Sequence, residues 1–292
     1  MKFRTECTPQ RSDLTLDPSR PAVMLGSCFA TNMAGKMREC LWPVFSGAGT
    51  LYNPLSIATI VELLVLSDNP LEELEASLFE SEGYVHSWLF DSHFSRLSAG
   101  ECLAAIDEAR QEMRRALEEA QVMIVTFGTA WCYYLQEKER YVVANCHKMP
   151  QSLFSRRRVS AGEIADVWTD LCARLRKLYP DLRIMFTVSP VRHLKDGFEG
   201  NARSKATLLL AVEEICERVG DAIYFPAYEI VTDDLRDYRF YASDLVHPSE
   251  EAVEYIWEKF RGSYVDEAGE RMLREGNKEY KRRQHRPIKK QG

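Results

Sequence analysis

Short apolar runs alternate along this chain with longer segments in which apolar residues recur every three or four positions. Short runs bounded by turn residues are typical of buried parallel strands, and the longer period is that of an amphipathic helix. The pattern predicts four strands, with a shorter fifth, at residues 22–25, 122–127, 183–188 and 222–225, and at 42–45. It predicts helices at residues 27–41, 54–66, 101–120, 161–178, 204–219 and 248–260.

This alternation indicates an α/β fold with a mainly parallel, doubly wound sheet and helices on both faces. Two stretches break the rhythm and are expected to be insertions over a sheet edge, near residues 79–99 and 132–160. No domain boundary is evident, so we expect a single domain over residues 1–277. Residues 278–292, rich in Lys and Arg, then form a basic C-terminal tail.

Composition narrows the class of protein. The 292 residues are 45% hydrophobic and 28% charged, with a net charge of -6, so nothing global favours nucleic acid or an anionic membrane. We expect neither partner, since the basic tail is better explained as a solvated terminus. No apolar run approaches the roughly 20 residues of a membrane-spanning helix, and no secretory leader is evident. The eight cysteines are dispersed without a Cys-x-x-Cys motif, which favours a reduced, cytoplasmic protein.

The chemistry-bearing residues follow strands. The turn Gly26-Ser27-Cys28-Phe29-Ala30 places a hydroxyl and a thiol at a helix N-terminus, where the helix dipole is expected to lower the pKa of the thiol. Gly128-Thr129 and Ser189-Pro190-Val191-Arg192-His193 follow the next two clear strands. Because ligands bind beyond the carboxyl ends of such strands, these turns should gather at one edge.

A second motif lies on the loop that enters the predicted helix at residues 248–260. Asp244 and His247 are three residues apart, as in a pair in which the carboxylate orients an imidazole base. The same residues could instead cap that helix, together with Ser249 and Pro248. Nucleophile, base and orienter together are the minimum set for acyl transfer.

Taken together, these motifs resemble those of a known family. Gly26-Ser27-Cys28-Phe29-Ala30 matches the signature of the GSCFA domain family, which belongs with the SGNH (GDSL-like) hydrolases. The resemblance covers roughly residues 20 to 262 and implies a three-layer α/β/α sandwich and ester-bond chemistry. It is carried further by Leu51-Tyr52-Asn53-Pro54, Ala144-Asn145-Cys146-His147-Lys148, Ser189-Pro190-Val191-Arg192-His193, and Tyr238-Arg239-Phe240-Tyr241 running into Asp244 and His247.

Alignment on the SGNH blocks implies roles. Cys28 takes the nucleophile position and Ser27 the position before it, although Ser27 as nucleophile or N-cap, or no nucleophile at all, are alternatives. Asp244 and His247 match the fourth block as orienter and base. Gly49 or Gly47 would supply an oxyanion N–H as the second block. The third block reads Gly128-Thr129-Ala130-Trp131, so its oxyanion asparagine is absent. The N–H groups of Cys28 and Gly49, or the amides of Asn53 or Asn145, are the candidate substitutes.

Other residues are candidates for substrate binding. Arg192, beside His193, suits a carboxylate or phosphate, or forms an ion pair with Asp196. His147 could line the site or pair with Cys146, or be a satisfied loop histidine. Ser204 is expected near a helix N-cap, with Lys205 facing the site as a weaker expectation. Aromatic residues could wall an acyl or sugar pocket or belong to the core; they are Trp88, Phe90, Phe94, Trp131, Tyr133 and Tyr134.

The sequence therefore predicts an SGNH-like hydrolase of a small-molecule or saccharide acyl ester. Cys28 or Ser27 would form an acyl-enzyme, with His247 as base and Asp244 as orienter. No metal or redox cofactor is expected, since the histidines and cysteines lack zinc-ligand spacing. An acyltransferase of the same mechanism and a non-catalytic ligand-binding protein are the alternatives.

Overall fold

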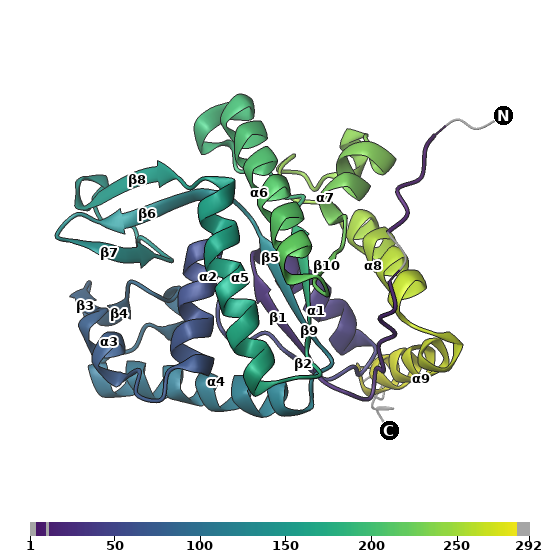
Figure 1. Cartoon of the computed structure of the whole chain (residues 1–292), viewed down its shortest axis with the longest axis horizontal. Coiled ribbons are helices and arrows are strands. Elements are labelled where there is room, and N and C mark those ends of the chain that lie inside the picture. The colour runs from purple at the N-terminus through teal and green to yellow at the C-terminus, as the bar shows by residue number, and fades with distance from the viewer. Residues whose placement is uncertain (1–3, 10–11, 285–292) are drawn as a thin grey trace, which may run out of the picture.

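Five parallel strands form the centre of the molecule in this computed structural model, which describes residues 4–9 and 12–284 (Figure 1). Across the sheet the order is β10-β9-β5-β1-β2, and every neighbouring pair is parallel. The strands are β1 (Ala22–Gly26), β2 (Val44–Phe45), β5 (Val122–Phe127), β9 (Arg183–Val188) and β10 (Ile223–Tyr224). The doubly wound sheet and all five strands predicted from the apolar pattern are confirmed.

Helices cover both faces of the sheet. One face carries α2 (Pro54–Val61) with its π-helical continuation Glu62–Leu66, α4 (Ala99–Glu119), α5 (Ala161–Leu178) and α6 (Gly197–Val219). The other carries α1 (Cys28–Glu39), α8 (Glu250–Tyr264) and α9 (Glu267–Gln284). The short helix α3 (Leu71–Ala76) lies at the periphery (Figure 1). The short helix α7 (Ala227–Glu229) and the π-helical turn after it, Ile230–Leu235, contribute buried side chains to the second face. The fold is a three-layer α/β/α sandwich.

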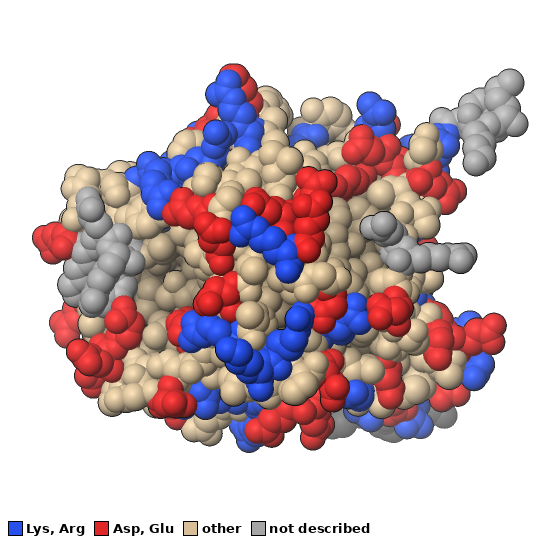
Figure 2. All heavy atoms as spheres, viewed as in Figure 1, with Lys and Arg blue, Asp and Glu red and all other residues tan. Residues whose placement is uncertain are grey.

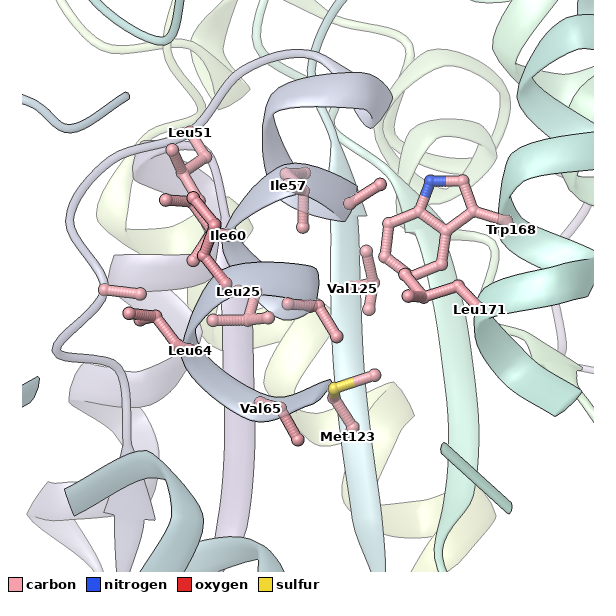
Figure 3. Packing of buried hydrophobic residues seen from close by; sticks show 14 of the residues in the cluster. Leu25, Leu51, Ile57, Ile60, Leu64, Val65, Met123, Val125, Trp168 and Leu171 are labelled. Carbon is pink, nitrogen blue, oxygen red and sulfur yellow. The ribbon is translucent and has the colours of Figure 1, made fainter. Parts of the chain in front are cut away.

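The two layers of core follow from the alternation of side chains along each strand. Val23 and Leu25 of β1 face the cluster beneath α2, α4, α5 and α6, while Ala22 and Met24 face the cluster beneath α1, α8 and α9. Figure 3 shows the first cluster, in which Leu25 and Val125 from the strands meet the apolar side of α2 and Trp168 of α5. A sheet buried on both faces holds its strand ends in fixed positions.

The two insertions form small sheets of their own. Near residues 79–99, strands β3 (Leu78–Ser81) and β4 (Tyr84–Ser87) make a hairpin. Near residues 132–160, β6 (Trp131–Leu135) pairs antiparallel with β7 (Lys138–Val143) and β8 (Phe154–Arg158). Four of the six candidate wall residues are instead buried in hydrophobic clusters; they are Trp88, Phe90, Phe94 and Tyr134.

Helix α6 begins at Gly197, so the expectation of a helix start near Ser204 was wrong. The Ser204 hydroxyl does not bond to its own helix. It accepts the N–H of Ala130 at 2.8 Å and lies 3.1 Å from the Thr129 hydroxyl. A serine that looks like a cap in sequence is therefore used to join the helix interior to the turn after β5.

Helix α9 crosses the expected boundary between domain and tail at residue 278. Asn277 donates from its amide to the Glu39 carbonyl at the end of α1, at 3.1 Å, and Leu273 is buried. The tail up to Gln284 therefore belongs to a helix that packs on the domain. Its last residues, 285–292, lie outside the described residues.

On the face shown in Figure 2, basic and acidic side chains lie intermixed over the helices. Two ion pairs illustrate this arrangement: Arg174 of α5 with Glu62, and Arg218 of α6 with Asp166, each at 2.6 Å. Within the described ranges, none of the helices combines the length and apolar character needed to cross a bilayer.

Substitution of Gly26, at the end of β1, should destabilise the fold strongly. Its φ is +136°, and an added Cβ would lie 2.3 Å from the carbonyl oxygen of Thr126 on β5. Gly26→Ala should lower the free energy of unfolding by more than about 2 kcal/mol, because backbone strain and a backbone clash add together. Urea denaturation measures the change.

Gly35→Ala in α1 is the matched control, since nothing lies within 4 Å of its added Cβ. Alanine favours a helix interior by roughly 0.5–1 kcal/mol, so this variant should be slightly more stable than wild type. Equal stability of the two variants would contradict the close approach of β1 to β5.

Candidate active site

The turn between β1 and α1 presents a thiol. Cys28 is the first residue of α1 and is partly exposed, whereas Ser27 is completely buried. Ser27 holds the N-cap position, yet its side chain makes no capping bond and its Oγ has no partner within the described residues. Ser27 is therefore the N-cap of α1 by position, without the side-chain bond of a cap. Only Cys28 offers substrate an accessible nucleophile at this turn.

Burial raises the pKa of the Cys28 thiol above its usual value. The backbone N–H groups of Phe29 and of Cys28, and the charge of Lys205, act to lower this pKa, but they do not offset the loss of water. The expectation of a lowered thiol pKa was wrong, because desolvation outweighs the helix N-terminus. At neutral pH the thiol keeps its proton, so attack requires a base.

Asp244 and His247 form a hydrogen-bonded pair. Asp244 Oδ2 lies 2.6 Å from His247 Nδ1, and Oδ1 accepts the backbone N–H groups of Val246 and His247 at 2.9 and 3.0 Å. The backbone N–H groups of His247 and Val246, with the imidazole, lower the pKa of Asp244 to about 2. The carboxylate is thus charged at neutral pH and fixes the ring through Nδ1. Within the described residues, the Nε2 atom of His247 has no hydrogen-bond partner.

The loop that carries this pair is held by Arg192. The Arg192 guanidinium lies 4.2 Å from the ring centroid of Tyr241, and its backbone N–H donates to the Val246 carbonyl at 3.2 Å. The expected ion pair between Arg192 and Asp196 was wrong, because Asp196 pairs with Arg156. Arg192 is therefore placed to position His247, and the helix-cap role falls to Ser249, which accepts the N–H of Ala252.

The turn after β5 packs against Tyr52. The Tyr52 carbonyl accepts the N–H groups of both Gly128 and Thr129, at 2.8 and 2.9 Å. A Cβ at position 128 would lie 2.9 Å from that carbonyl and 3.2 Å from Nε2 of His193, so glycine permits the close approach. Gly128 and Thr129 shape the site, but their N–H groups are already engaged.

Lys205 is a buried charge that the sequence only weakly indicated. Its Nζ donates to the carbonyls of Gly128 at 2.6 Å and Ser189 at 2.7 Å, at the ends of β5 and β9. Burial lowers the pKa of Lys205 to about 7. The sequence signal was its spacing, since Lys205 shares a helix face with the buried Leu208 and Val212.

His193 lies between these elements. Its ring meets Tyr52 edge-on, with centroids 5.6 Å apart, and its backbone N–H donates to Asn201 Oδ1 at 2.9 Å. Burial, then the charges of Lys205 and His247, lower the pKa of His193 to about 4. The imidazole is therefore neutral at pH 7. Its Nε2 is buried and has no partner in the described part of the chain.

The other residues considered as oxyanion donors make contacts of their own. Asn53 caps α2, accepting the N–H of Ser56 at 2.8 Å and donating to its hydroxyl at 2.9 Å. Asn145 Oδ1 accepts the N–H of His147. Gly49, with φ of +80°, packs against Asp91, whose Oδ2 accepts the N–H of Thr50 at 2.7 Å. Thr50 in turn forms a β-bridge with Gly26, so Gly49 lies close to the turn that carries Cys28.

His147 lies apart, beneath the β3–β4 hairpin. Its Nε2 lies 2.9 and 3.0 Å from the carbonyls of Ser87 and Phe90, and its ring packs against Phe79. These contacts match a satisfied loop histidine. In the described residues no group of histidine, cysteine, aspartate or glutamate side chains could hold a metal ion.

A cleft of about 330 Å³ adjoins the site at Tyr52, Asn53, Thr129 and His193. Its wall is aromatic and polar, so it can receive a molecule with both apolar and hydrogen-bonding parts. The sheet of β6, β7 and β8 and the loop after β9 complete the lining, which includes Trp131, Tyr133, Asn145, Gln151, Arg156, Lys195 and Asp196.

Comparison with known proteins assigns this chain to a family. No curated protein matches the sequence. Among solved structures, the chain is similar to an acetyl xylan esterase (Est2A) from the rumen bacterium Butyrivibrio proteoclasticus, with 11% identity and a TM-score of 0.40. The similarity covers 87% of this chain but 66% of that protein, slightly under two thirds of its length. The GSCFA family matches residues 21–260, and the chain therefore belongs to the GSCFA family.

Proposed function

We propose that this protein hydrolyses acyl esters through a covalent acyl-enzyme on Cys28. The observation that carries the proposal is the hydrogen-bonded Asp244–His247 pair. Its loop bonds to Arg192 after β9, at the sheet edge where the partly exposed thiol of Cys28 follows β1. Two electrostatic effects support the closeness of this pair to Cys28 and His193. The charge of Asp244 acts to raise the pKa of the Cys28 thiol, and the charge of His247 acts to lower the pKa of His193. Membership of the GSCFA family supports the same reaction class.

The chemistry follows from the protonation states. His247 Nε2 takes the proton of the Cys28 thiol as sulfur attacks the ester carbonyl carbon. The tetrahedral adduct collapses, the C–O bond to the alcohol breaks, and His247 returns the proton to the leaving oxygen. Water, deprotonated by His247, then attacks the thioester and releases the carboxylic acid and the thiol. Asp244 keeps the imidazole in one tautomer and stabilises its charged form throughout.

The neighbouring cleft indicates the substrate class. Trp131 offers a broad aromatic surface, with the Arg156 guanidinium 4.1 Å from its ring centroid, and Asn145 and Gln151 supply amides. Aromatic surfaces beside amides suit a polar ring such as a sugar, with hydrogen bonds at its rim. We therefore propose a saccharide or a comparably polar alcohol as the part of the ester that Cys28 releases.

Alkylation of Cys28 by iodoacetamide tests the state of the thiol. Because its pKa is raised above 9.0, the thiolate fraction should grow about tenfold per pH unit between pH 7 and 9. Peptide mapping resolves Cys28 from the other cysteines, and Cys28→Ala gives the blank. A rate that is already level at pH 7 would contradict a protonated thiol and the need for a base.

Acylation by 4-nitrophenyl acetate tests the nucleophile and the base. Intact mass and peptide mapping should find an acetyl group on Cys28 in wild type and in Ser27→Ala, and none at that position in Cys28→Ala. His247→Ala should slow acylation by about 10²–10⁴-fold, because the thiol loses its base. His93→Ala, an exposed histidine, is the control and should match wild type.

Acetylation of Ser27 in place of Cys28 would overturn the assignment of the nucleophile. A wild-type protein that binds acetylated sugars saturably but releases no alcohol and forms no adduct would instead be a binding protein. An adduct that forms at the same rate in His247→Ala would remove His247 from the mechanism.

A further inference from the structure

Ester cleavage needs hydrogen-bond donors for the negative oxygen of the tetrahedral adduct. Several donors near Cys28 are already used: both N–H groups of the turn after β5, at Gly128 and Thr129, bond to the Tyr52 carbonyl. The Asn53 amide caps α2, with one of its two N–H groups donating to the Ser56 hydroxyl. The first N–H groups of α1 can also donate here, and so can Nε2 of His193, which has no partner within the described residues.

That nitrogen lies close to the turn that carries Ser27 and Cys28. Nε2 of His193 lies 3.2 Å from the point that a Cβ on Gly128 would occupy, and the same point lies 3.5 Å from Cβ of Ser27, the residue before Cys28. A side chain at Gly128 would therefore occupy the space between the imidazole and this turn. A buried nitrogen without a hydrogen-bond partner is costly, so a bound group that supplies the partner would be stabilised here.

The surroundings hold the ring rigid and neutral. Tyr52 packs against its edge, and Asn201 anchors its backbone N–H. Lys205 from α6 and His247 from the opposite loop both disfavour a second proton on the ring. A neutral imidazole has one N–H to donate, and a ring that resists protonation is a poor base at neutral pH. Donation suits this environment better than proton transfer.

We propose that His193 is a further catalytic residue, which donates its Nε2–H to the oxyanion. This role rests on the proposed reaction at Cys28. As sulfur bonds to the carbonyl carbon, the π electron pair moves to oxygen, and the His193 hydrogen bond strengthens. No proton is transferred to the oxyanion, and the pair returns when the C–O bond to the alcohol breaks. His193 then takes the part of the amide donor that the turn Gly128-Thr129-Ala130-Trp131 lacks.

A rival role for His193 is that of a base. Ser27 Oγ is also buried without a partner in the described residues, so His193 could in principle activate Ser27 rather than stabilise an oxyanion. Glutamine separates the two roles. Its side-chain amide can donate from a similar position, yet it neither titrates nor accepts a proton at neutral pH.

The experiment compares wild type with His193→Ala and His193→Gln, using 4-nitrophenyl acetate and the rate of acetylation of Cys28. We expect His193→Ala to lower the rate by about 10²–10³-fold with little change in KM, as for removal of one oxyanion donor. His193→Gln should recover most of that loss and keep the acid limb of the wild-type pH profile. His93→Ala controls for the loss of a histidine, and urea denaturation checks that each variant is folded.

Each outcome is decisive. If Cys28 is acetylated in wild type and His193→Ala reacts at the same rate, the oxyanion role is wrong while the proposed function stands. If His193→Gln is as slow as His193→Ala and the acid limb moves, His193 acts as a base and the donor role is wrong. If wild type gives no adduct on Cys28, the proposed function fails and the oxyanion role falls with it.

A binding measurement covers the case in which His193→Ala folds poorly. The thiol of Cys28 passes its proton to His247 as sulfur adds to the carbonyl carbon of 1,1,1-trifluoroacetone, which forms a tetrahedral adduct with a negative oxygen. Wild type and His193→Gln should bind this ketone similarly, and His193→Leu should bind it about 10²-fold more weakly. Equal affinity of His193→Gln and His193→Leu, both weaker than wild type, would overturn the donor role.

Discussion

A single buried ammonium joins the two strands that shape the site. Lys205 reaches from α6 to the carbonyls of Gly128 and Ser189, which terminate β5 and β9. Buried carbonyls need hydrogen-bond donors, and an ammonium with three N–H groups can donate to the carbonyls at two strand ends at once. Within the described residues Lys205 has no carboxylate partner, so its charge is not neutralised locally. The side chain that joins the ends of β5 and β9 therefore also influences the pKa values of the groups around it.

The charge of Lys205 reaches both sides of the candidate site. It favours the thiolate form of Cys28 and disfavours protonation of His193. Desolvation opposes the first effect and reinforces the second, so the thiol keeps its proton while the imidazole stays neutral. The Asp244 carboxylate is charged at neutral pH, so the candidate site at rest combines a protonated thiol and a neutral His193 imidazole with a charged Asp244. In the proposed reaction, further charge would develop during attack, where the pair of His247 and Asp244 can balance it.

The parts of this site come from opposite faces of the sheet. Cys28 begins α1 on one face, and Lys205 belongs to α6 on the other, while His193 follows β9 between them. They meet because parallel strands deliver all their carboxyl ends to one edge. The loop from Tyr238 to Ser249, held by Arg192, brings Asp244 and His247 to the same edge from the end of the chain.

Local sequence was sufficient for much of this arrangement. The bounds of β5, β9 and α5 were predicted to the residue, because apolar runs and helical periodicity reflect burial along one short segment. The contact between Asp244 and His247 was predictable because the two are three residues apart in one loop. The first residue of α6 was not predictable in this way. Ser204 looks like a helix cap in the sequence, but its hydroxyl has its partners on a distant turn.

What the sequence by itself determined is the order of strands and helices, the family, and which turns carry the thiol, the imidazole and the carboxylate. Only the tertiary structure decided the state of those groups. Burial raised the pKa of Cys28 against the helix dipole. In the folded chain Arg192 packs on Tyr241 rather than pairing with Asp196, and Nε2 of His193 has no partner within the described residues. Periodicity and turn chemistry are local, whereas desolvation and the choice of partner depend on segments far apart in the chain, so they exist only once the chain is folded.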